Sequence, residues 1–326
     1  RSARLQVSRG MKTVVAGTII LYIASTFLAP TSVSKVAQMG MLPFAACLAI
    51  VGLGQTLVIQ QGGIDLSVAG AVSLTVVIVT WGPDRNDDRL LPAVGAAFCA
   101  AIITGLVNGF LVTKTKLNSI VATLGVNALL YGVMMGLSGG SPRRTTDRLS
   151  HFANDKTFGL PHSIYFGVIL TIIVTILLKR TVFGRRFEAV GANPNAAYAT
   201  GLKIVRYQIG AYVSAQILYC AAGVILGGVI SQPTAYQGDD YVLPSVAIVV
   251  LGGTSLLGGR GFPAASALAA LFLKQLDMFV LSLGVPYGVR TIVISASLML
   301  GIALYAVNWK SSNFLFKKPD KSLQLV

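Results

Sequence analysis

Three polar side chains inside one apolar stretch are the first candidates for chemistry. Lys274, Gln275 and Asp277 lie near the middle of an apolar run at about 263–283. Lys274 and Asp277 are three residues apart, so on a helix they would share a face and could form an ion pair. Ionisable groups at this depth usually face a bundle interior or a wet cavity. The sequence therefore leaves two interpretations of equal weight, a structural ion pair and a contact with a solute.

A second set of candidates lies where glycines interrupt the apolar pattern. Gly62 and Gly63 precede Asp65 and Ser67 in the sequence GGIDLS. Two glycines would end one helix, and Asp65 or Ser67 would cap the next one. We favour this capped turn, near the inner surface of a membrane, over the alternative in which Asp65 lines a polar path.

A longer glycine-rich break covers residues 252–261, with the sequence GGTSLLGGRG. Five glycines in ten residues cannot hold an isolated helix, and freed backbone at membrane depth must be buried in protein or face water. Pro263 suits the first position of a following helix. We expect a re-entrant or loop structure close to a solute path, with a plain turn nearly as well supported. The glycines singled out in the two breaks are Gly62, Gly63, Gly252, Gly253, Gly258 and Gly259.

Single polar residues in other apolar runs have simpler expected roles. Asn108 and Asn127 should form hydrogen bonds between helices. Cys47, Cys99 and Cys220 lie in apolar runs without metal-ligand spacing, so we expect three small buried side chains and no metal site. The complete set of solute-path candidates is Asp65, Ser67, Asn127, Lys274, Gln275 and Asp277.

The elements that must position these residues are membrane spans. Of the 326 residues, 54% are hydrophobic and 11% charged, whereas a soluble domain carries about 25% charged residues. Apolar runs of membrane-spanning length recur along the whole chain. The prediction is an all-α polytopic membrane protein of about ten transmembrane helices, at about 13–29, 36–60, 66–81, 90–113, 119–138, 161–178, 207–230, 242–257, 263–283 and 287–308.

The placement of Lys and Arg predicts the orientation of these spans. With both termini inside, the inner segments carry 17 basic residues and the outer loops 7, which are matched by seven Asp. This asymmetry is the expected signal for a cytoplasmic inner side. We therefore assign to the cytoplasm a basic head (1–12), a loop (179–206) and a tail (309–326). The net charge of +15 then reflects topology and gives no reason to expect a nucleic-acid partner.

One polar segment in the loop 179–206 carries its own helix signals. Asn193 can cap a first turn through its side-chain oxygen, and Pro194 suits the first helical position. Ala196 and Ala197 favour a helix, and Gly201 supplies a left-handed stop. A helix of about two turns is marginal alone in water and needs packing. We hypothesise that a partner protein receives it.

The chain lacks the motifs that are typical of ATP-hydrolysing and other hydrolytic enzymes. It contains no GxxxxGK[ST], no HExxH and no serine-hydrolase elbow. The chain is therefore not expected to be an enzyme or to hydrolyse ATP by itself.

Several motifs in this order resemble the permease subunits of bacterial ATP-binding-cassette importers, specifically the ribose-type monosaccharide branch. They are GGIDLS at 62–67, GLVNGFLV at 105–112, VATLG at 121–125 and VVLGGTSLLGGRG at 249–261. The polar helix resembles the importer coupling motif, EAA followed by three residues and Gly, from Asn195 to Gly201. Asn195 replaces the usual Glu, so an acidic contact to the ATPase is either lost or taken over by Glu188.

The resemblance implies an importer-permease helical bundle, a single permease domain over 1–326 in the bacterial cytoplasmic (inner) membrane. Such a subunit pairs with a second permease, identical or related. A cytoplasmic ATPase binds ATP and Mg, and a periplasmic or lipoprotein binding protein delivers a sugar. No cofactor is implied in this chain, which contacts membrane lipid and no nucleic acid. The implied ATPase-coupling residues are Glu188, Gly191, Asn193, Pro194, Asn195, Ala196, Ala197 and Gly201.

Two other functions remain open from the sequence. An ion-coupled secondary transporter would use Asp65 or Asp277 as its coupling acid. A related importer permease would carry nucleosides or branched-chain amino acids, although GGIDLS favours a sugar.

Overall fold

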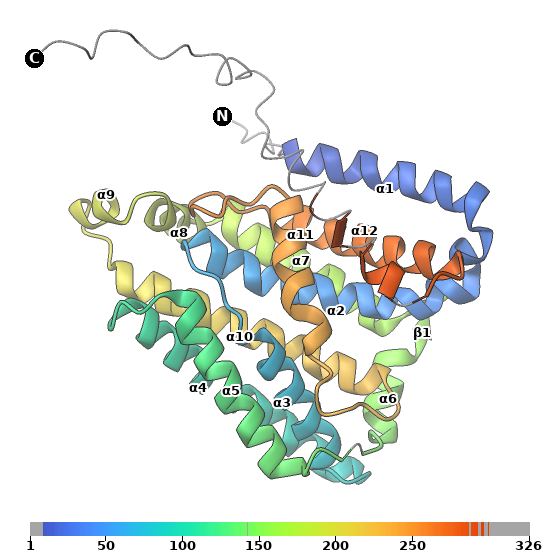
Figure 1. Ribbon diagram of the computed structural model, residues 1–326. Helices are drawn as coiled ribbons and strands as arrows, with labels where there is room; N and C mark the ends of the chain where they lie inside the picture. The colour runs from blue at the N-terminus through green and yellow to red at the C-terminus, as the bar shows by residue number, and fades with distance from the viewer. Residues whose placement is uncertain (1–8, 142, 287, 293–294, 297–298, 300–326) are drawn as a thin grey trace, which may run out of the picture.

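The computed structural model describes residues 9–141, 143–286, 288–292, 295–296 and 299. The described chain is helical apart from one short hairpin (Figure 1). Of the expected segments, 1–8 and the tail 309–326 lie outside the described residues, and so does most of the tenth span, 287–308. The α-helices are α1 (Arg9–Leu28), α2 (Lys35–Gln60), α3 (Val68–Trp81), α4 (Leu90–Thr113), α5 (Ser119–Ser138), α6 (Asp147–Asn154), α7 (His162–Arg180), α8 (Val182–Ala192), α9 (Pro194–Ala199), α10 (Ile204–Val229), α11 (Val242–Leu251) and α12 (Pro263–Ser282).

Seven helices in the described part are long and apolar enough to cross a membrane, namely α1, α2, α4, α5, α7, α10 and α12. The chain is thus a polytopic membrane protein, as predicted. Two expected spans are shorter. α3 has 14 residues and α11 has 10, which gives rises of about 21 and 15 Å against a hydrocarbon core of about 30 Å.

The prediction of an eighth span at 242–257 is wrong at its C-terminal end. α11 ends at Leu251, and Gly253 then takes a φ of +88°. This left-handed conformation is open to glycine and strained for other residues, so it stops the helix.

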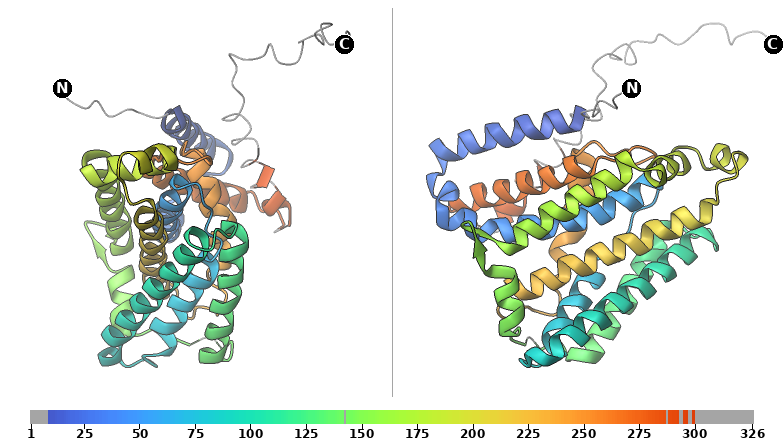
Figure 2. Two further views of the ribbon diagram at one scale, coloured as in Figure 1. Left: turned by 90° about the vertical axis from the view of Figure 1, so that its left-hand side faces the viewer. Right: turned by 180° about the vertical axis from the view of Figure 1, so that it is seen from behind.

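The helices run between two ends of the molecule (Figure 2). One end, here called the α9 end, gathers the turn 61–67, the connection 114–118, the segment 181–203 and the loop 252–262. The opposite end, the α6 end, gathers the connections 29–34, 82–89, 139–161 and 230–241. Hydrogen bonds join segments within each end, for example from Gly259 N–H to Gln60 O (2.8 Å) and from Thr145 N–H to Ser231 O (3.2 Å).

The core forms around α2 and α10, which are the most buried of the long helices. Within their apolar windows, 83% and 67% of residues are buried, against 22% in α1 and α7. α10 packs on α2, α3 and α4, and α2 also packs on α7, α11 and α12. Small residues allow the close approach: a Cβ on Gly105 of α4 would lie 2.5 Å from Val213 Cα of α10.

Two features differ from the sequence expectation. A two-stranded hairpin, β1 (Lys156–Thr157) with β2 (Leu160–Pro161), follows α6 at the α6 end. Cys47 and Cys220 are buried as predicted, but Cys99 is exposed. Cys99 lies on α4, whose outward face is covered by no other described helix, so apolar sequence there does not mean burial in protein.

Candidate functional site

The predicted short polar helix is present as α9. The Asn193 side chain accepts a hydrogen bond from Ala196 N–H at 3.1 Å, and Pro194 occupies the first helical position. Gly201 follows with a φ of +81°. The predicted cap, start and stop of this helix are therefore confirmed, because all three depend on local backbone chemistry.

The side chains of α9 divide into a buried and an exposed side. Ala197 is only 5% exposed, because it packs inside its own chain. Tyr198 is 73% exposed, and Asn195 and Ala196 are exposed as well. A partner can therefore contact Asn195, Ala196 and Tyr198, whereas Ala197 holds α9 to the rest of the chain.

The segment before α9 is also helical, which the sequence analysis missed. In α8, the Thr181 hydroxyl accepts a hydrogen bond from Gly184 N–H at 3.1 Å and caps the first turn. Phe187 and Val190 are buried, and Phe183 packs on Phe187. Phe183, Phe187 and Val190 are spaced as i, i+4 and i+7, and this helical spacing could have predicted α8 from the sequence.

Glu188, the predicted substitute for the missing acidic residue of the motif, is engaged within the chain. Its carboxylate lies 3.7 Å from Lys179 Nζ, and Lys179 also lies 4.8 Å from the centre of the Phe262 ring. Because both partners of this ion pair are partly exposed, the pair contributes little stability. A contact between Glu188 and a partner protein stays a prediction.

Glycines connect α8 to the end of α2 and to the loop 252–262. A Cβ on Gly191 would lie 2.0 Å from Gln60 O, and a Cβ on Gly258 would lie 2.6 Å from Gly191 O. Gly259 N–H donates to the same Gln60 oxygen at 2.8 Å. We call these four residues, Gln60, Gly191, Gly258 and Gly259, the glycine joint. Backbone is in direct contact there, so a movement of α8 would press on the end of α2 and on the loop.

The loop 252–262 contains no helix or strand, so the predicted break in the helix is confirmed, and the choice between a re-entrant loop and a plain turn stays a prediction. It connects α11 to α12 at the α9 end and contacts α8 through the glycine joint. A place for Gly252, Gly253, Gly258 or Gly259 beside a solute path stays a prediction.

Asp65 lies in a buried hydrogen-bond network after Gly62, which has a φ of +80°. One carboxylate oxygen accepts from Ser67 N–H (2.9 Å) and Ser67 Oγ (2.6 Å), and the other accepts from Gln216 Nε2 (3.0 Å). Asn108 Nδ2 donates to Ser67 Oγ at 2.8 Å. The predicted turn is therefore present, although the Ser67 hydroxyl bonds to Asp65 and does not cap α3.

The two predicted asparagines both join helices. The bond from Asn108 connects α4 to the start of α3, and Asn127 of α5 accepts a hydrogen bond from Gly70 N–H of α3 at 2.7 Å. The interhelical role is confirmed for both. Sequence analysis missed Gln216, which ties α10 to Asp65, because a single polar residue in an apolar run does not name its partner.

The predicted pair between Lys274 and Asp277 is wrong. The Asp277 carboxylate accepts two hydrogen bonds from Arg290 Nε and Nη2, each of 2.6 Å. A guanidinium offers this two-pronged geometry and an ammonium does not, so Arg290 takes the carboxylate. Lys274 Nζ lies 5.7 Å from the centre of the Tyr241 ring instead.

Gln275, the third candidate on α12, is fully buried. Its amide accepts from Gln38 Nε2 at 2.7 Å and donates to Ser25 Oγ at 3.1 Å, so it ties α12 to α1 and α2. The structure therefore does not bring the six solute-path candidates together. Asp65, Ser67 and Asn127 lie around the start of α3, and the other three lie on α12.

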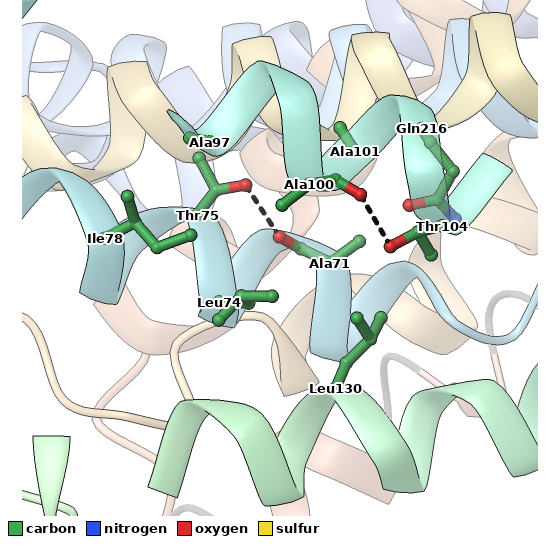
Figure 3. Close-up of a pocket in the computed structure, with 10 residues that line it drawn as sticks. All are labelled: Ala71, Leu74, Thr75, Ile78, Ala97, Ala100, Ala101, Thr104, Leu130 and Gln216. Carbon is green, nitrogen blue, oxygen red and sulfur yellow. Dashed lines mark hydrogen bonds between the residues drawn. The ribbon is translucent and has the colours of Figure 1, made fainter. Parts of the chain in front are cut away.

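A cavity of about 10 Å³ lies between α3, α4, α5 and α10, with Thr75, Thr104, Leu130 and Gln216 on its walls (Figure 3). This volume matches about one water molecule, whereas small-molecule pockets measure about 300–1,000 Å³. The cavity is therefore too small to hold a sugar in this conformation. Among the described residues, no group of three His, Cys, Asp or Glu is placed to hold a metal ion.

Charge is arranged differently at the two ends. At the α6 end, two basic residues are paired: Arg143 lies 2.7 Å from Asp84, and Arg144 lies 3.8 Å from Asp147. Five others lie at that end without a described ion pair, so its seven Lys and Arg residues are matched by seven Asp residues in number only; the five are Lys35, Arg85, Arg89, Arg148 and Lys156. The Asp155 carboxylate also bonds to His151 there and raises the pKa of its imidazole. At the α9 end, Lys179 is the basic residue with a described ion-pair partner. Lys114, Lys116, Arg180, Arg185, Arg186, Lys203, Arg206 and Arg260 lie at this end without one in the described part of the chain.

Comparisons with known proteins identify relatives that match most of the chain. The family described as "Branched-chain amino acid transport system / permease component" matches residues 37–307. A ribose import permease protein, RbsC, of Bacillus subtilis is 31% identical over 88% of this chain and 90% of its own length. The Escherichia coli K12 protein of the same name is 32% identical over 89% of this chain and 92% of its own.

A third relative is named for a different solute. The autoinducer 2 import system permease protein LsrD of Photorhabdus temperata is 28% identical over 78% of this chain and 79% of its own length. No solved structure matches the chain.

Proposed function

This chain belongs to the family of branched-chain amino acid transport system permease components, and we propose that it forms the solute path of an ATP-driven importer for a sugar or sugar-like solute. It is a permease component of such an importer and not the ATPase. The observation that carries the choice of solute is the match to ribose import permeases over about nine-tenths of both chains.

The exposed side of α9 supports a site for the partner ATPase. Asn195, Ala196 and Tyr198 face outward, and the positive end of the helix is open to an acidic surface. ATP and Mg would be held by that ATPase, so no cofactor is proposed for this chain. Closure of the ATPase would push α9, and the glycine joint would pass that movement to α2 and the loop 252–262.

The charge arrangement supports an orientation with the α9 end in the cytoplasm. The α9 end carries nine Lys and Arg residues, against seven at the α6 end that are matched by seven Asp residues. An excess of Lys and Arg marks the cytoplasmic side of a membrane protein. In this orientation both termini are cytoplasmic, a second permease completes the path across the inner membrane, and a binding protein docks at the α6 end.

Two alternatives remain. The family is named for branched-chain amino acid transport and one relative for autoinducer 2 import, so a different small solute is the nearer alternative. An ion-coupled transporter is less well supported, because Asp65 and Asp277 are both occupied by hydrogen bonds within the chain.

Uptake by cells tests the proposed solute class. A strain lacking this gene and the same strain with the gene restored would be given radiolabelled ribose, galactose and leucine at equal concentrations. We expect the restored gene to increase uptake of at least one of the two sugars and to leave leucine uptake unchanged. Increased leucine uptake with unchanged sugar uptake would contradict the proposal.

A further inference from the structure

A basic cavity opens beside α9, at the junction of α8 and α10. It has a volume of about 300 Å³, and its walls carry three cationic and two aromatic side chains. Arg186 comes from α8, Lys203 is the residue before α10, and Arg206 lies in the first turn of α10. The aromatic residues are Phe183 and Tyr207. We call these five residues the basic pocket.

The positive charge of the basic pocket is not balanced within the described chain. Arg186, Lys203 and Arg206 form no ion pair with a described carboxylate, and Glu188, the acidic residue of α8, is paired with Lys179. Three cations around one cavity repel one another, so an anion entering the cavity would be attracted by all of them. Two of the three are guanidinium groups, which match the oxygens of a phosphate in a two-pronged geometry.

The apolar surroundings point to the source of that anion. The Phe183 and Tyr207 rings lie 5.7 Å apart, centre to centre. Phe183 and Val182 are about half exposed, and they lie at the start of α8, which contacts α7. α7 itself carries an exposed set of apolar residues, Ile169, Ile172, Ile173 and Ile176. α7 is a membrane-length helix that is mostly unburied by protein. A molecule with acyl chains along α7 would therefore present its headgroup to the basic pocket.

We propose that the basic pocket binds the phosphate of an anionic phospholipid headgroup. Basic pockets at the cytoplasmic ends of membrane helices are suited to such headgroups, and each Lys or Arg strengthens the attraction. Lys203 lies two residues after Gly201, in the connection from α9 to α10. The bound headgroup would therefore also hold the base of α9 in place.

The test is lipid binding to the full chain in a neutral detergent, counted by native mass spectrometry. Dioleoylphosphatidylglycerol is the probe, dioleoylphosphatidylcholine the neutral lipid, and sodium phosphate the free anion. We compare Arg186→Gln/Lys203→Gln/Arg206→Gln with the matched variant Lys114→Gln/Lys116→Gln/Arg180→Gln, which removes equal charge at the same end. At roughly fivefold per basic residue, the pocket variant should lose on the order of 100-fold in phosphatidylglycerol affinity, and the matched variant far less.

A folding control accompanies the binding measurement. A thiol-reactive dye reports unfolding through the buried Cys47 and Cys220, and both triple variants should unfold at the wild-type temperature. If the pocket variant fails to fold, Arg186→Gln and Arg206→Gln alone should each lose roughly fivefold in affinity.

Three outcomes would overturn the proposal. The first is equal loss of phosphatidylglycerol affinity in both triple variants, which would show non-specific attraction. The second is displacement of bound phosphatidylglycerol by millimolar sodium phosphate as effectively as by added lipid, which would show that the site binds a free anion. The third is unchanged lipid affinity in a pocket variant that no longer co-purifies with an ATPase, which would make the pocket a protein contact. None of these depends on which solute is transported.

Discussion

Replacement of Gly191 by alanine should disrupt the glycine joint. The new Cβ would lie 2.0 Å from Gln60 O, whereas close carbon–oxygen contacts measure about 3.3 Å. The backbone of α8 or of the end of α2 must therefore move by about 1 Å. Forced shifts of this kind cost about 1–3 kcal/mol. The movement would also disturb the hydrogen bond from Gly259 N–H to the same oxygen.

Gly210→Ala is the matched control. Gly210 lies inside α10, and a Cβ there would meet no atom within 4 Å. Both substitutions gain the helix preference of alanine over glycine, about 1 kcal/mol. Because this gain is common to both, the difference between the two variants isolates the steric cost.

Thermal unfolding of the purified chain measures that difference, with a dye that reacts with Cys47 and Cys220 as they become exposed. At about 2–4 °C per kcal/mol, Gly191→Ala should unfold about 2–12 °C below Gly210→Ala at one heating rate. In membranes that contain the partner ATPase, Gly191→Ala should also weaken solute-stimulated ATP hydrolysis. Equal unfolding temperatures and equal stimulation in the two variants would refute the joint.

The remaining predictions concern α9, the ion pair on α12 and the orientation of the chain. Tyr198→Arg should reduce ATPase co-purification at an unchanged unfolding temperature, whereas Ala197→Arg should lower that temperature because its site is buried; the reverse pattern would count against the assignment of the two sides. Asp277→Asn removes a two-pronged pair that is partly buried, and it should raise the KM for the solute if the residue lines the path; a fall in unfolding temperature with unchanged uptake kinetics would make the pair structural. An impermeant thiol reagent should label Phe158→Cys in intact cells and Asn195→Cys in inverted vesicles alone, and labelling of Asn195→Cys in intact cells would overturn the orientation.

Local signals in the sequence predicted local structure correctly. Asn193, Pro194 and Gly201 determine the limits of α9 through backbone chemistry that needs no distant partner. The apolar runs likewise predicted the long helices, because their length alone matches a bilayer.

Tertiary pairing could not be predicted in the same way. Asp277 and Lys274 share a helix face, yet Asp277 pairs with Arg290, which the turn after α12 brings back to it. The contact between Gly191 and Gln60, 131 positions earlier in the chain, could not be predicted, because glycine has no side chain whose chemistry would indicate a partner. The role of Gln216 beside Asp65 was hidden for the same reason.

The most direct test of the central claim is uptake into proteoliposomes that contain this chain and its co-purified ATPase. With the binding protein outside and radiolabelled ribose as the probe, we expect accumulation above the outside concentration when ATP is enclosed with the ATPase. No accumulation is expected with ADP, or with this chain alone under an imposed sodium or proton gradient. Uphill accumulation by the chain alone, driven by such a gradient, would contradict the account.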